Sequence, residues 1–213
     1  MPIILAAARL FAGVNAPILA IGRGIAIVLM ALMVVVILIQ IYFRFIDGTG
    51  VEALVRSLTG IELSNGALPW TEEAARFMML WVVGVAVPTA FRRGGFVAID
   101  MVLLMLPRTL GGLVSLALLG LSLLVLVVGV KIGWGEVTGF GGRFATAALK
   151  YPTDLSFENW VKVPRSWMMA SLLVGLTLMV SVCVELIIRT IAELAGRGAD
   201  LPEIPESATV GAE

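Results

Sequence analysis

Histidine is absent from this 213-residue chain, and cysteine occurs only once, at Cys183. Without histidine, the protein cannot use imidazole as an acid, a base, a proton shuttle or a metal ligand. A single cysteine forms neither an intramolecular disulfide nor a Cys-x-x-Cys redox pair. No glycine-rich phosphate loop precedes a Lys-Ser or Lys-Thr pair. We therefore predict no catalytic, cofactor-binding or metal-ligating residues, and we do not expect an enzyme.

Charge is also scarce, because charged residues make up 14% of the chain and hydrophobic residues 60%. A typical soluble domain has about 25% charged and about 45–50% apolar residues. The 15 basic residues balance the 15 acidic ones. This balance lacks the basic excess expected of a nucleic-acid-binding protein. The apolar excess predicts a protein that is surrounded by membrane lipid.

Four apolar segments are long enough to cross a hydrocarbon core of about 30 Å, which takes about 20 helical residues. They cover about residues 24–43, 71–91, 110–132 and 166–188. A further apolar segment, residues 96–106, would reach only roughly 16 Å as a helix, so we expect it to lie in the membrane interface. The predicted fold class is an all-α membrane protein with four transmembrane helices and a short interfacial helix between spans two and three.

The segments outside these spans are expected to differ in order. Residues 1–14 are interpreted as a cytoplasmic or interfacial arm, because Arg23 interrupts the apolar pattern before the first span. The polar stretch 133–163 is too long for a tight turn and is expected to have structure of its own. We predict one membrane domain, residues 1–199, followed by a disordered tail, residues 200–213, which is rich in Pro, Glu and Ala.

An even number of spans places both termini on the same side of the membrane. Basic residues are equally numerous on the two sides, so their number alone does not orient the chain. The arginines that flank the short loop after the second span are denser than the basic residues of the long third loop. This density favours cytoplasmic termini.

Charged residues cluster at the start of the second span. Thr71 is a suitable N-cap, and the acidic Glu72 and Glu73 suit the positive end of the helix dipole. Arg76 can reach either carboxylate, because residues three and four apart lie on one helix surface. Two interpretations remain open: a cap with a local salt bridge near the headgroups, and a polar cluster that faces a partner.

The same span carries two tryptophans, and their spacing predicts that they share a helix face. Trp70 is most simply an interfacial anchor. Trp81 lies deeper and is expected to pack against a partner helix or against lipid. Gly84 together with Pro88 predicts a kink in the second half of this helix.

Glu185 and Arg189 repeat the glutamate-to-arginine spacing near the end of the fourth span, and we favour a self-satisfied pair at the interface over a functional pair. Asp100 is expected to point to water from the interfacial helix. With these assignments, charges collect at the ends of the spans and leave the middle of the membrane without ionisable groups. The sequence therefore predicts no proton or ion path.

The order and spacing of these residues resemble the small membrane subunit of TRAP transporters, the DctQ-type permease, over about residues 69–107. That family opens its second span with Trp-x-Glu-Glu-x-x-Arg, places a Trp and a Gly within it, and follows it with Arg-x-Gly-x-His-Ile-x-Val-Asp. The matching residues here are Trp70, Glu72, Glu73, Arg76, Trp81, Gly84, Arg92, Gly94 and Asp100. Phe96 stands where the family usually has the histidine, which favours a packing or interfacial role for this motif.

The resemblance implies a non-catalytic subunit of a tripartite, ATP-independent secondary transporter in the bacterial cytoplasmic membrane. In such a system, a soluble extracytoplasmic binding protein captures an organic acid anion. A much larger membrane subunit then moves the anion, driven by a sodium gradient. The small subunit would scaffold the large one. The implied partners are the large permease, the binding protein and membrane lipid, with no nucleic acid.

A self-sufficient, homo-oligomeric four-span transporter or channel is the alternative hypothesis. Small proton-coupled exporters of that kind need a membrane-embedded carboxylate. The predicted first span has none, and Glu72 and Glu73 lie at a helix start. A membrane enzyme is disfavoured by the missing histidine, the missing cysteine pair and the lack of an acidic cluster for a divalent metal.

Overall fold

A computed structural model of the chain describes residues 2–46, 69–93, 107–152, 160–198 and 201. Its four long helices are α1 (Pro2–Ile46), α3 (Pro69–Arg92), α5 (Arg108–Thr138) and α6 (Ser166–Leu194). Each is long and apolar enough to cross a membrane. This confirms the predicted all-α fold with four transmembrane helices. The predicted interfacial helix, residues 96–106, lies outside the described residues, as does most of the predicted tail.

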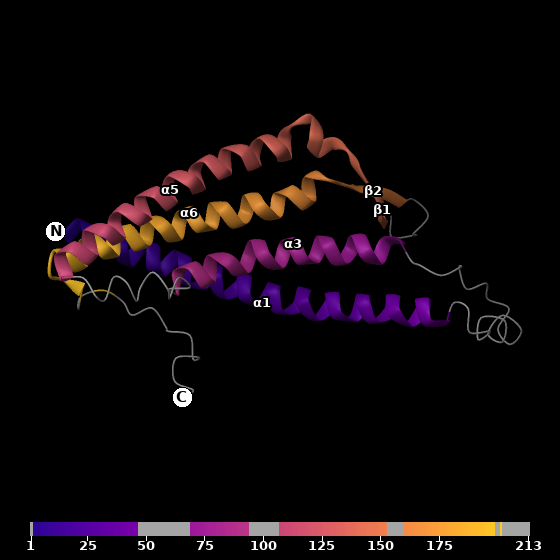
Figure 1. Ribbon diagram of the computed structural model, residues 1–213, viewed down its shortest axis with the longest axis horizontal. Coiled ribbons are helices and arrows are strands. Elements are labelled where there is room, and N and C mark those ends of the chain that lie inside the picture. Colours follow the sequence, from indigo (N-terminus) through magenta and orange to yellow (C-terminus); the bar gives the residue numbers. More distant parts are fainter. Residues whose placement is uncertain (1, 47–68, 94–106, 153–159, 199–200, 202–213) are drawn as a thin grey trace, which may run out of the picture.

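The helices lie side by side in the order α5, α6, α3, α1, with α5 and α1 at the two edges (Figure 1). Helix α1 also contacts α6, because α3 is shorter than both. The start of α1 lies at the same end of the bundle as the start of α5 and the end of α6 (Figure 1). We call this the terminal end of the bundle.

A short antiparallel hairpin marks the opposite end, which we call the hairpin end. After α5, a single 3₁₀ turn, η1 (Phe140–Arg143), leads into β1 (Ala145–Pro152), which pairs with β2 (Trp160–Pro164). The Thr146 hydroxyl donates to the carbonyl oxygen of Val163 across the pair, at 2.9 Å. The polar stretch after the third span therefore has structure of its own, as its length predicted.

Helix α1 is much longer than the sequence suggested. Its 45 residues would extend about 68 Å, more than twice the thickness of a hydrocarbon core. The predicted first span, residues 24–43, is part of a single helix that runs from Pro2, so most of the segment interpreted as an arm is continuous with it. Arg23 is exposed on the surface of this helix, so its charge requires no break.

The inner face of α1 repeats every seven residues, with buried or half-buried positions alternately four and three apart, as in a coiled-coil seam. Its residues are Ala8, Ala12, Asn15, Leu19, Gly22, Ala26, Leu29, Met33, Val36 and Gln40. Many of them are small, which brings the backbones close: a Cβ atom on Gly22 would lie 3.2 Å from the Val85 carbonyl oxygen of α3. Most of the large aliphatic side chains of α1 therefore face outward.

Helix α3 begins at Pro69, before the expected cap. Proline suits the first turn, where a backbone N–H has no helical acceptor. Thr71 is fully buried inside that turn rather than standing as the N-cap. Helices α5 and α6 both continue beyond the predicted spans, to Thr138 and Leu194.

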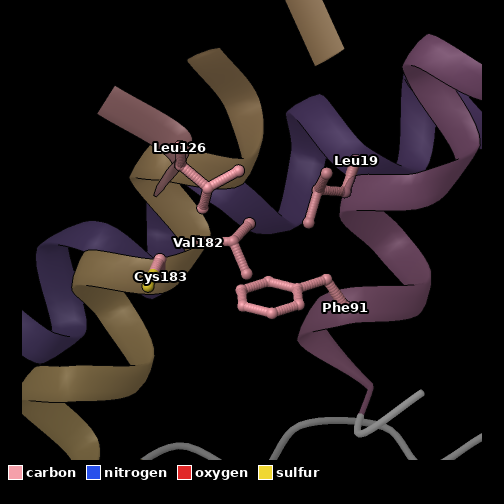
Figure 2. Packing of buried hydrophobic residues seen from close by; sticks show 5 residues of the cluster. All are labelled: Leu19, Phe91, Leu126, Val182 and Cys183. Carbon is pink, nitrogen blue, oxygen red and sulfur yellow. The ribbon is translucent and has the colours of Figure 1, made fainter. Parts of the chain in front are cut away.

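The hydrophobic core draws on all four helices. Its buried members are Leu19, Phe91, Leu126, Val182 and Cys183. Figure 2 shows the Val182 side chain of α6 among those of Leu19, Phe91 and Leu126. Since Phe91 directly precedes Arg92, and Val182 lies one helical turn before Glu185, this core is next to the charged residues described below.

Candidate functional site: a buried ionic network and a clamped hairpin

Glu185 of α6 is the most deeply buried charged residue among those described, with an exposed fraction of 0%. Burying an unpaired carboxylate would cost roughly several kcal/mol, because the group loses its hydration. Glu185 therefore requires partners. The partners come from three helices: Arg92 of α3, Arg189 of α6 and Asn15 of α1. We call these four residues the ionic network.

Arg92 makes the most extensive contact with the buried carboxylate. Its Nη2 donates to Glu185 Oε1 at 2.6 Å, and its Nε lies 3.0 Å from Oε2 and 3.2 Å from Oε1. The planar guanidinium thus grips both oxygens, the arrangement that makes arginine–carboxylate pairs strong and directional. Arg92 is the last residue of α3, so its charge also suits the negative end of that helix dipole.

Arg189 completes the pair that the sequence spacing predicted. Its Nε donates to Glu185 Oε1 at 3.2 Å, and both side chains are buried. The predicted pair therefore forms, but its interpretation as self-satisfied is wrong. The carboxylate binds two further helices, and the bundle encloses it.

Asn15 connects α1 to the same carboxylate. Its Nδ2 donates to Glu185 Oε2 at 2.7 Å, and its Oδ1 accepts a hydrogen bond from the Ser181 hydroxyl at 2.8 Å. Asn15 has an exposed fraction of 2%. Sequence reasoning missed it because it lies between the predicted arm, residues 1–14, and the predicted first span, residues 24–43. The sequence did offer one signal: Asn15 is a polar residue at an inner-face position of the seven-residue repeat of α1.

In this arrangement both Glu185 oxygens accept hydrogen bonds from fixed donors on different helices. Such a carboxylate acts as a cross-link between α1, α3 and α6. Losing Glu185 would leave two buried guanidinium groups without their carboxylate, which costs about 3–5 kcal/mol in comparable networks. The network therefore fixes how the three helices lie at the terminal half of the bundle.

At the hairpin end, the Glu73 carboxylate binds backbone amides of β1. Its Oε2 accepts the backbone N–H groups of Ala148 and Leu149, at 2.7 and 2.6 Å, and its Oε1 accepts that of Ala147 at 2.9 Å. These amides lie where the regular pairing of β1 with β2 is interrupted. Glu73 thus clamps the hairpin to the start of α3.

Glu72 and Arg76 form the ordinary ion pair of this region. Both side chains are mostly exposed, at 62% and 67%. Of the two interpretations of the predicted cluster, the local salt bridge describes Glu72 and Arg76. The second acidic residue, Glu73, leaves the cluster and binds the hairpin.

A close crossing of α3 and α6 lies between these two sites. A Cβ atom on Gly175 would lie 2.6 Å from the Gly84 carbonyl oxygen, and one on Gly84 would collide with the Ser171 carbonyl. Pro88 has no N–H to donate to the Gly84 carbonyl four residues earlier. That freed carbonyl instead faces Gly175 of α6, in the place that a side chain at position 175 would occupy.

The remaining predicted residues are dispersed. Trp70 is partly exposed at the start of α3, and Trp81 is half-buried, with its ring centroid 6.3 Å from that of Phe77. Gly94 and Asp100 lie outside the described residues. Among the motif residues, the structure thus brings Arg92 into the ionic network and Glu73 onto the hairpin, and it does not gather the motif into one site.

The four long apolar helices are typical of a multi-pass membrane protein. Residues 33–193 match the family model of the DctQ component of tripartite ATP-independent periplasmic transporters. The chain belongs to this family of transporter components. Neither a curated protein nor a solved structure matches it.

Proposed function

We propose that this chain is the small integral-membrane subunit that scaffolds a larger permease in a tripartite secondary transporter. The transporter would take up an organic acid anion delivered by a soluble binding protein, driven by an ion gradient. The chain would lie in the bacterial cytoplasmic membrane with both termini in the cytoplasm. The observation that carries the proposal is the family match over residues 33–193.

The state of the acidic residues supports a scaffold. Glu185 is surrounded by three fixed partners, Glu73 accepts three backbone amides, and Glu72 is paired with Arg76. A coupling-ion or proton site needs a carboxylate that can exchange its partner during transport. The described part of the bundle holds no buried carboxylate in that condition.

The outer surfaces of the two edge helices also support a scaffold. Exposed large aliphatic side chains follow α1 from Leu10 to Ile41 and α5 from Leu110 to Ile132. Because α5 and α1 lie at the two edges of the bundle, these apolar surfaces are available to lipid and to a membrane partner (Figure 1). Two such surfaces suit a subunit that packs against a larger one.

Purification of the full chain with an affinity tag, from cells that express the whole transporter, tests the proposal. In a mild detergent, we expect a much larger membrane protein to co-purify with it. Liposomes that contain the tagged chain alone should show no ion-coupled flux. A chain that transports by itself would contradict the proposal and support the homo-oligomeric alternative, provided that replacing Glu72 and Glu73 with Gln abolishes that flux.

A further inference from the structure

Exposed aromatic side chains are confined to one end of the described bundle. They are Tyr42, Trp70, Trp134, Phe140, Phe144 and Trp167, all at the hairpin end. The terminal end exposes large aliphatic residues instead, such as Leu10, Leu110 and Leu194. Tryptophan and tyrosine gather where a protein passes from hydrocarbon to headgroups, because their rings are amphipathic. The hairpin end therefore has the composition of a membrane–water boundary.

The same end carries exposed cations, which we call the cationic rim. Its members are Lys131, Arg143, Lys150, Lys162 and Arg165. None of them forms an ion pair with another described residue. Residues 131–165 also contain Glu136, Asp154 and Glu158, so basic residues still outnumber acidic ones in this stretch. The rim thus carries a positive charge that the described structure does not neutralise.

We propose that the cationic rim binds the anionic phospholipid headgroups of the adjacent leaflet. The position of Lys131 favours lipid over an acidic protein. It lies within α5, next to Ile132 and one turn after Val128, whose side chains are 62% and 48% exposed. From such an apolar surface, a lysine extends its ammonium along the helix toward the headgroups.

The other cations lie near the same boundary. Arg165 and Trp167 stand at the start of α6, as Lys131 and Trp134 stand near the end of α5. Glu73 fixes the hairpin that carries Lys150 to the start of α3. Lipid binding at this end also explains why basic residues are as numerous here as at the terminal end, although the positive-inside rule alone would favour one side.

The test uses the full chain alone, so it does not depend on the proposed larger subunit. The chain is solubilised with equal parts of phosphatidylglycerol and phosphatidylcholine, and native mass spectrometry measures which lipid stays bound. We expect several-fold enrichment of phosphatidylglycerol. Because salt screens exposed charges, this enrichment should fall when the salt concentration rises from about 0.05 M to about 0.5 M.

A rim variant that combines Lys131→Gln, Lys150→Gln and Lys162→Gln should lose the enrichment. A control variant, Arg9→Gln with Arg23→Gln, removes two exposed cations of α1 outside the rim and should keep the enrichment. Equal retention of the two lipids by the unmodified chain would overturn the proposal, and so would a rim variant indistinguishable from the control. The same rim variant can also be placed in the assembled transporter. If it keeps its lipid enrichment but the transporter no longer attaches the binding protein, the proposal is overturned in favour of a protein-docking surface.

Discussion

Two glutamate–arginine pairs with identical spacing have opposite surroundings in this protein. Glu72 and Arg76 lie at the exposed start of α3, whereas Glu185 and Arg189 are enclosed within the bundle. In each pair the two residues lie about one helical turn apart, so the spacing predicts both contacts equally well. What differs is the tertiary partner, because Arg92 and Asn15 approach only Glu185. Spacing predicts that a pair forms, and burial decides what it contributes.

The largest difference between the two pairs should appear when the glutamate is removed. Glu185→Ala leaves two buried guanidinium groups without their carboxylate and should cost about 3–5 kcal/mol of stability. Glu72→Ala is the matched control, and it should cost no more than about 1 kcal/mol because water solvates Arg76. Reversible unfolding in mixed micelles measures both values. Similar losses in the two variants would show that burial does not set the importance of these pairs.

The crossing of α3 and α6 should be the next most sensitive feature. Gly84→Ala pushes a Cβ atom into the Ser171 carbonyl, and overpacking of this kind costs about 1–3 kcal/mol. Gly120→Ala is the control, because a Cβ atom there meets no atom within 4 Å. It should be neutral or stabilising, by up to about 1 kcal/mol, through better helix propensity. If both alanine variants unfold alike, the close crossing is not required.

A smaller and more local effect is expected at the hairpin. Glu73→Gln removes the charge that the amides of Ala147, Ala148 and Leu149 share, and charge-assisted hydrogen bonds are about twice as strong as neutral ones. We expect faster hydrogen exchange at these three amides, by about tenfold, with the ionic network unchanged. Glu72→Gln should leave their exchange rates as they are. Uniformly faster exchange along the whole chain would instead indicate a global loss of stability.

The smallest effect should come from Arg76. Arg76→Ala breaks only an exposed ion pair, which is worth about 0.3–0.5 kcal/mol on a helix surface. Thermal unfolding should therefore change little, and attachment of a larger subunit should persist. Loss of that attachment, with the fold intact, would revive the hypothesis that this charged turn faces a partner.

The sequence predicted the elements better than their contacts. Apolar length was sufficient to find four membrane helices, because the thickness of the bilayer sets that length. The same rule did not reveal that the helix of the first span begins at Pro2, since Arg23 was treated as an interruption. In the structure, its side chain simply lies on the exposed side of a continuous helix.

The ionic network lay beyond prediction for a tertiary reason. Asn15, Arg92 and Glu185 belong to three helices that are far apart in the sequence, so no local spacing connects them. Arg92 and Glu73 were identified within a motif that the resemblance supplied. Their partners, a buried carboxylate and a set of backbone amides, became identifiable only in the folded chain.

The central claim is that the network around Glu185, rather than the exposed pair at Glu72, holds the helices in the arrangement that a larger transporter subunit requires. The most direct measurement is parallel co-purification of that subunit with the unmodified chain, the Glu185→Gln variant and the Glu72→Gln variant in the same mild detergent. We predict that Glu185→Gln loses most of the larger subunit, whereas Glu72→Gln retains it at the unmodified level. Equal recovery with both variants would contradict the claim.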